Sequence, residues 1–242
     1  MNTKITDRKQ NIDPAELHKF EDVAHQWWDP EGAFKPLHML NPLRAAFIDR
    51  HAGLAGKQVL DIGCGGGLLS EAMALRGARV TGLDMVEASL KVAELHGLES
   101  GARVEYRMDT AEHFAEQHPA VFDVVTCLEM LEHVPDPRSV IAAVARLVKP
   151  GGHVFFSTIN RTFKAYALAI IGAEYILGML PKGTHDYAKL IKPSELATWS
   201  RREGLCFEHM EGMHYNPFTQ GFTMGGHVDV NYIVHAAKGS GD

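Results

Sequence analysis

The chain has 242 residues, of which 45% are hydrophobic and 22% charged, and its formal net charge is −6. These proportions fit a globular protein that can bury a core without disulfides, and the acidic balance argues against a general nucleic-acid binder. The three cysteines lack CxxC spacing. They argue against a disulfide framework or a zinc site and favour a reducing cytosol. The polar N-terminus has no apolar signal-peptide core, so we expect an intracellular protein.

Predicted elements alternate regularly after an irregular start. We expect residues 1–50 to form an N-terminal helical cap and residues 51–242 to form the main domain, with an apolar insertion at about 161–192. Alternating strands and helices predict a doubly wound, mostly parallel α/β sheet, with an antiparallel addition at its edge from residues 205–210 and 230–236. The parallel strands are predicted at residues 58–62, 79–83, 104–107, 122–127 and 154–158, and helices at 14–50 in part, 68–76, the stretch ending at 96, and 137–148.

A glycine cluster directly follows the first predicted strand, in the sequence Asp61-Ile62-Gly63-Cys64-Gly65-Gly66-Gly67. Such a turn lets backbone N–H groups approach a ligand closely, with a helix N-terminus behind them. A P-loop would require Gly-Lys-Ser/Thr, and a dinucleotide fingerprint from Gly63 would require glycine at the position of Leu68. The Asp61 carboxylate suits the ammonium group of a bound amino acid and would repel a pyrophosphate. A generic tight turn is the structural alternative.

Two further carboxylates follow strands. Asp84 ends the second predicted strand, where it can accept both hydroxyls of a ribose, although NAD enzymes use the same device. Asp109 follows the third strand and can reach an adenine amino group. Its alternative role is to cap the helix that begins near Thr110. Together these residues predict a nucleoside site beside the glycine turn.

This combination resembles the pattern of class I S-adenosylmethionine (SAM)-dependent methyltransferases over residues 56–158. The resemblance implies that SAM is the cofactor and that Leu128, after the fourth strand, lies against it. Met85, next to Asp84, is a further cofactor-binding candidate.

A second set of motifs resembles one family of this class, the ubiquinone biosynthesis O-methyltransferases. These motifs are Trp27-Trp28-Asp29, Phe34-Lys35-Pro36-Leu37-His38, Asn41-Pro42-Leu43-Arg44, the run from Glu129 to Pro137, and Gly183-Thr184-His185-Asp186. The resemblance implies O-methylation of a catechol-type hydroxyl on polyprenylated ubiquinone precursors, 2-polyprenyl-6-hydroxyphenol and 3-demethylubiquinol. It also implies that Arg44 meets the cofactor carboxylate, the alternative being a surface arginine at a helix end. Methylation of another phenol or amphiphile, an NAD-dependent oxidoreductase and a lipid-binding module are the rival functions.

The chemistry requires deprotonation, because a phenol with a pKa of about 10 is mostly protonated at neutral pH. Glu129, Glu132 and His133 are spaced i, i+3 and i+4, which predicts that they share one side of a helical turn at the end of the fourth strand. Either His133 acts as general base, with Glu132 as a second catalytic candidate, or the three hold a divalent cation such as Mg²⁺ that chelates both catechol oxygens. A carboxylate that only braces the loop is the structural alternative.

The remaining aromatic residues and histidines are assigned to packing. Trp27, Trp28 and His38 are expected to form a packed lid, and His185 and Asp186 are expected beside the site. Most of the three C-terminal histidines are expected at the edge or the surface: His214, His227 and His235.

The segment Phe163–Leu180 is apolar, and basic residues flank it. Glu174 and its glycines argue against a membrane span, so we predict an apolar cover that docks on anionic lipid at the inner face of the cell membrane. An ordinary buried helix is the alternative. Other proteins of ubiquinone biosynthesis are further candidate partners. The flanking basic residues are Arg161, Lys164, Lys182, Lys189 and Lys192.

Overall fold

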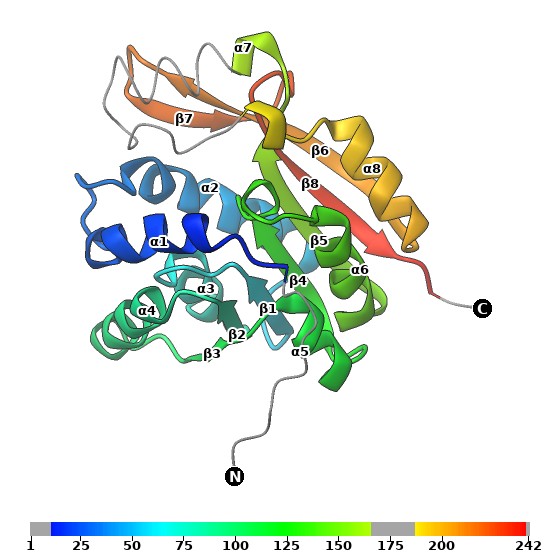
Figure 1. The fold of residues 1–242 in the computed structure, drawn as a ribbon, viewed down its shortest axis with the longest axis horizontal. Coiled ribbons are helices and arrows are strands. Elements are labelled where there is room, and N and C mark those ends of the chain that lie inside the picture. Colours follow the sequence, from blue (N-terminus) through cyan, green and yellow to red (C-terminus); the bar gives the residue numbers. More distant parts are fainter. Residues whose placement is uncertain (1–10, 166–186, 241–242) are drawn as a thin grey trace.

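The computed structural model describes residues 11–165 and 187–240. Within these residues one sheet holds the strands in the order β3-β2-β1-β4-β5-β8-β6-β7, with helices on both faces (Figure 1). The parallel strands are β1 (Gln58–Ile62), β2 (Arg79–Asp84), β3 (Val104–Met108), β4 (Phe122–Leu128) and β5 (Val148–Ile159), and the antiparallel ones are β6 (Leu205–Asn216), β7 (Gly221–Met224) and β8 (Asn231–Lys238). The predicted fold class is confirmed.

The antiparallel part differs from the prediction in two respects. β8 lies between β5 and β6, so it is an interior strand. β7 pairs with the far end of β6 and extends the sheet by a short hairpin, for which the sequence pattern gave no expectation.

The helices of the described chain alternate with the strands. They are α1 (Pro14–Val23), η1 (Ala24–Gln26), α2 (Lys35–Ala52), α3 (Leu68–Ala74), α4 (Glu87–Ser100), α5 (Ala111–Gln117), η2 (Leu131–His133), α6 (Pro137–Leu147), α7 (Phe163–Ala165), η4 (Tyr187–Lys189) and α8 (Pro193–Arg202). Local chemistry starts several of them. Asp13 caps α1, Thr110 caps α5 and Asp136 caps α6, each by accepting a backbone N–H.

Strand periodicity divides the core into two layers, because successive side chains of a strand point to opposite faces. Val59 and Phe155 face α2 and α3, whereas their neighbours Leu60 and Phe156 face α5, α6 and α8. Phe47 of α2 lies in the first layer. The second half of the N-terminal region is therefore part of the cover of the sheet.

Residues 166–186 lie outside the described residues, and with them most of Phe163–Leu180, Lys182, and the pair His185 and Asp186. Within residues 11–165 and 187–240, none of the helices combines the length and apolar composition that a membrane crossing requires.

Three of the described basic residues around this segment are paired with acidic side chains. Arg161 forms an ion pair with Glu195, and Lys164 with Asp229 at 3.1 Å. Lys189 lies 3.1 Å from a carboxylate oxygen of Asp13 and also contacts α1 through Glu16. The predicted positive cluster is thus largely neutralised at these three positions, because tertiary contacts bring acidic side chains to them.

Candidate active site

A cavity of about 860 Å³ lies at the carboxyl ends of β1, β2 and β4. Parallel α/β sheets bind ligands at this end of their strands, where the strand order reverses, and here it reverses between β1 and β4. α1 and residues of α2 line the cavity from the other side. All the cofactor-binding candidates line it: Arg44, Asp61, Gly63, Gly65, Asp84, Met85, Asp109 and Leu128.

The glycine turn and the tryptophans pack directly against each other. A Cβ atom added to Gly65 would lie 2.3 Å from the Trp27 ring, and Gly65 has the left-handed φ of 53° that favours glycine. Trp27 stacks on Phe34, with ring centroids 3.7 Å apart, and donates its indole N–H to Ser89. Trp28 donates its indole N–H to the Gly66 carbonyl at 2.9 Å. Both tryptophans therefore pack against the glycine turn, as expected; their role as a lid stays a prediction.

One buried and one half-buried carboxylate lie at the cavity wall. Asp61 is 3% exposed and accepts hydrogen bonds from Ser70 Oγ at 2.6 Å and Thr126 Oγ1 at 2.7 Å. Burial raises the pKa of Asp61 to about 6, although the two hydroxyls oppose the rise. A cationic ligand group would relieve the cost of this buried charge.

Asp84 accepts hydrogen bonds from the backbone N–H groups of Gly65 and Val86, each at 2.8 Å. Burial raises its pKa, and the backbone donors oppose that rise. One N–H of the glycine turn therefore orients this carboxylate, while each oxygen retains a second lone pair for a ligand.

Asp109 and Arg44 have environments that the sequence did not specify. Thr110, not Asp109, caps α5, and Asp109 instead pairs with His113 Nδ1 at 2.8 Å. Arg44 is 6% exposed within α2, so it is not a surface arginine at a helix end. Its Nη2 donates to Glu129 at 2.5 Å, and its Nε is buried without a hydrogen-bond partner. A ligand carboxylate is the kind of group that would satisfy such an orphaned donor.

The expectation that Glu129, Glu132 and His133 share one side of a helical turn is wrong. Glu129 precedes η2 and has a left-handed φ of 52°, which breaks the helical spacing. It accepts hydrogen bonds from Arg44 and from Ser157 Oγ at 2.7 Å. Within the described residues, two groups of side chains have possible metal-ligand atoms within 4.8 Å of one another. Both groups contain His235, and neither contains Glu129, Glu132 or His133.

Glu132 lies on the core side of the loop. It is 3% exposed, accepts a hydrogen bond from Thr158 Oγ1 at 2.9 Å, and is absent from the cavity wall. Burial, with the nearby Glu129 charge, raises its pKa to about 7. The geometry fits a loop-bracing carboxylate rather than a group that reaches substrate.

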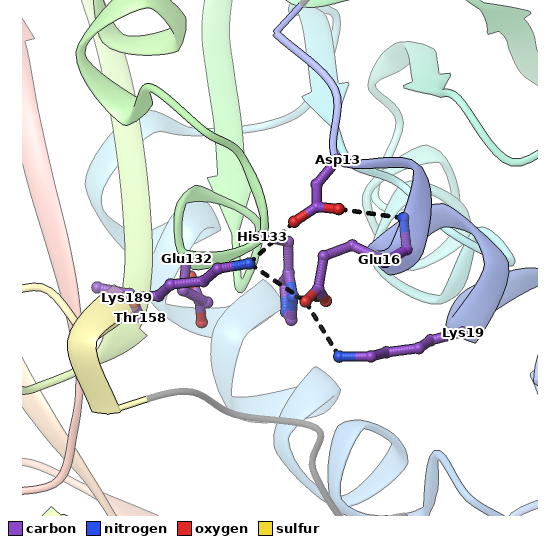
Figure 2. Close-up of polar contacts among 8 residues, drawn as sticks. Asp13, Glu16, Lys19, Glu132, His133, Thr158 and Lys189 are labelled. Carbon is purple, nitrogen blue, oxygen red and sulfur yellow. Dashed lines mark hydrogen bonds and ion pairs between the residues drawn. The ribbon is translucent and has the colours of Figure 1, made fainter.

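His133 lines the cavity and is held by the N-terminal helix. Its Nδ1 lies 3.0 Å from a carboxylate oxygen of Glu16, and Phe20 of the same helix meets its ring edge to face. Figure 2 shows Glu16 between His133, Lys19 and Lys189. The hydrogen bond from His133 is the main reason that the pKa of Glu16 falls to about 2. Sequence reasoning missed Glu16, because 117 positions separate it from His133.

Comparison with known proteins agrees with the fold. The profile of the methyltransferase domain family matches residues 37–209. Magnesium protoporphyrin IX methyltransferase from Synechocystis PCC 6803, solved with bound S-adenosylhomocysteine, superposes with a TM-score of 0.62 at 20% identity, over 92% of this chain and 87% of that one. A SAM-dependent methyltransferase from Thermotoga maritima superposes with a TM-score of 0.65 at 16% identity, over 92% and 99%. The fold and the site define a class I SAM-dependent methyltransferase.

Curated relatives narrow the assignment. The ubiquinone biosynthesis O-methyltransferase of Aromatoleum aromaticum is 63% identical over 228 residues, covering 94% of this chain and 97% of the relative. That of Stutzerimonas stutzeri is 64% identical over 230 residues, covering 95% and 99%. The chain therefore belongs to the family of ubiquinone biosynthesis O-methyltransferases, which are SAM-dependent enzymes.

Proposed function

We propose that the enzyme methylates a catechol-type hydroxyl of polyprenylated ubiquinone precursors, with 2-polyprenyl-6-hydroxyphenol and 3-demethylubiquinol as its substrates. The observation that carries the proposal is that His133 lines the same cavity as the candidate cofactor-binding carboxylates Asp61, Asp84 and Asp109. A ring beside His133 would stand next to the glycine turn where the cofactor is held. The substrate hydroxyl and the cofactor methyl group would then be close together in one cavity, from which bound ligands exclude water.

The residues of the cavity fit SAM. Its amino-acid part carries an ammonium and a carboxylate, which complement the buried Asp61 carboxylate and the unpartnered Nε of Arg44. Asp84 would hold the ribose hydroxyls, and Asp109 the adenine. Leu128 and Met85 supply apolar contact. When bound, SAM supplies a methyl group already activated by its sulfonium, so the protein mainly aligns the reactants and manages one proton.

His133 is the proposed general base. Nδ1 of His133 donates a hydrogen bond to the Glu16 carboxylate, and this orientation leaves Nε2 as the basic nitrogen. The phenolic proton would pass to Nε2 as the oxygen attacks the methyl group. Glu129 is held by Arg44 and Ser157, and Glu132 lies outside the cavity wall, so we assign no cation to them.

Transfer of a labelled methyl group tests both the substrate and the base. We expect turnover with a prenylated catechol and at least a tenfold lower kcat/KM for a catechol without the tail. His133→Ala should lower kcat by about 10²–10⁴ and leave affinity for S-adenosylhomocysteine unchanged. His118→Ala is the matched control, because His118 bonds the Phe114 carbonyl away from the cavity wall. Full activity of His133→Ala would remove His133 from the mechanism.

We further propose that the enzyme works at the cytoplasmic face of the cell membrane as a peripheral protein, where a polyprenyl tail resides. Two exposed aromatic side chains flank the cavity: Phe163 is 83% exposed and Phe218 is 95% exposed. Their chain neighbours Lys164 and Pro217 line the cavity wall. Aromatic side chains in such positions insert into the interfacial region of a bilayer.

Sedimentation with liposomes that contain anionic lipid tests this attachment. The double variant Phe163→Ser with Phe218→Ser should lose most of the bound fraction and retain cofactor affinity. Leu98→Ser is the control, because Leu98 is 82% exposed on α4 and lies outside the cavity wall. Absence of a lipid-bound fraction for the unmodified enzyme would contradict the proposal.

A further inference from the structure

A second polar cluster lies on the α2 face of the sheet, built from histidines of four elements. His235 of β8 is at its centre and is 2% exposed. β8 pairs with β6 on one side and with β5 on the other. On β6, His209 lies directly opposite His235. On β5, Phe155 lies opposite His235, and His153 lies two residues away from Phe155, diagonal to His235. His51, in the last turn of α2, stacks over His209 and His235, with ring centroids 4.3 and 5.2 Å away.

The cluster corrects the expectation that His235 lies at the edge or the surface. It is buried because β8 is an interior strand. The cluster is also separate from the active site: His153 precedes Ser157, which meets Glu129, by four residues on β5, or roughly 13 Å along a strand.

Two imidazole nitrogens of the cluster are buried without hydrogen-bond partners, Nδ1 of His235 and Nε2 of His51. Buried nitrogens of this kind are costly unless something binds them. One ring nitrogen each from His51, His209 and His235 come within 4.8 Å of one another.

Two neighbouring side chains, His153 and Glu208, add polar contacts to His235. His153 Nδ1 lies 2.9 Å from His235 Nε2, and this hydrogen bond can hold the His235 tautomer whose Nδ1 carries a lone pair. The ladder between β6 and β8 shifts register between Phe207 and His209. This irregularity brings Glu208 to the same side, where its carboxylate lies 3.4 Å from His235 Nδ1.

We propose that His51, His209 and His235 bind a divalent first-row transition metal ion, with Glu208 as the fourth ligand. Three imidazoles and one carboxylate suit Zn²⁺ in tetrahedral geometry and disfavour Mg²⁺ or Ca²⁺, which prefer oxygen ligands. His209 and Glu208 are exposed and provide the route of entry. Bound there, the ion would join α2 to the antiparallel end of the sheet. The cysteine spacing could not reveal this site, because none of its ligands is a thiolate.

Zinc binding to the tag-free, full-length enzyme tests the proposal. After removal of metal by a chelator, titration calorimetry should give one Zn²⁺ per chain, and X-ray absorption should show nitrogen and oxygen ligands at about 2.0–2.1 Å. Zn²⁺ should also raise the melting temperature of the apo protein.

Variants locate the ion. His209→Ala and His51→Gln alter side chains that are not fully buried, and each should weaken Zn²⁺ binding by more than about tenfold. Both should keep normal circular dichroism and normal affinity for S-adenosylhomocysteine. His18→Ala, on the exposed face of α1, is the matched control and should bind as the unmodified enzyme does. Failure of the enzyme to bind Zn²⁺, or binding that neither cluster variant weakens, would overturn the proposal.

Discussion

Replacing Glu16 with glutamine should release the N-terminal helix from the active site. The side chain keeps its size, but the charge that pairs with His133, Lys19 and Lys189 is lost. A pKa of about 2 in place of the ordinary 4.5 corresponds to roughly 3 kcal/mol at neutral pH. Glu16 is 8% exposed and lines the cavity, so water in the cavity screens part of this charge and about 1–2 kcal/mol remains. The equilibrium between docked and undocked α1 should therefore shift by about 5–30-fold.

Hydrogen exchange followed by mass spectrometry measures this shift. Amides of α1 (Pro14–Val23) should exchange about 5–30-fold faster in Glu16→Gln, whereas those of β1 should not change. The same argument fixes the pH dependence. A depressed carboxyl pKa contributes stability that is fully present above the unfolded value of about 4.5 and is lost as pH falls toward 2.

Glu21→Gln is the matched control, since Glu21 lies on the same helix, is mostly exposed, and forms a weak ion pair with His18 at 3.5 Å. If α1 exchanges at the same rate in Glu16→Gln as in the unmodified enzyme, the ion pairs do not hold the helix. If Glu21→Gln accelerates exchange equally, the cause is the change from glutamate to glutamine in the helix and not the loss of the Glu16 ion pairs, and the reasoning is refuted.

Three further changes test the remaining parts of the site. Asp84→Ala should abolish detectable cofactor binding, a loss of about 2–4 kcal/mol; unchanged calorimetric affinity for S-adenosylhomocysteine in a folded protein would contradict it. Exhaustive chelation should leave initial rates of methyl transfer unchanged, because Glu129 and Glu132 are engaged by protein donors; loss of turnover that Mg²⁺ restores would revive the cation mechanism. Gly65→Ala should displace Trp27 and weaken cofactor binding at least tenfold, because the new Cβ would meet the ring at 2.3 Å in a left-handed backbone; a normal Trp27 fluorescence spectrum and normal affinity would show that the lid tolerates the change.

The sequence by itself determined the features that depend on neighbours along the chain. Apolar periodicity located β1 to β5, and position at a strand end brought Asp61 and Asp84 to one cavity. Parallel strands end at the same edge of a sheet, so residues that follow them meet without any knowledge of side-chain contacts. The sequence also predicted that Trp27 and Trp28 are packed, and both contact the glycine turn or its surroundings.

Tertiary structure alone decided the partners of the ionisable groups. Glu129, Glu132 and His133 are near in sequence, yet a left-handed residue at Glu129 sends them to Arg44, Thr158 and Glu16. His235 became a buried residue because β8 inserts beside β5, a choice of strand order that local pattern does not encode. An ion pair or a ligand cluster forms between side chains that long-range packing brings within a few ångströms. Periodicity along the chain carries no information about that distance.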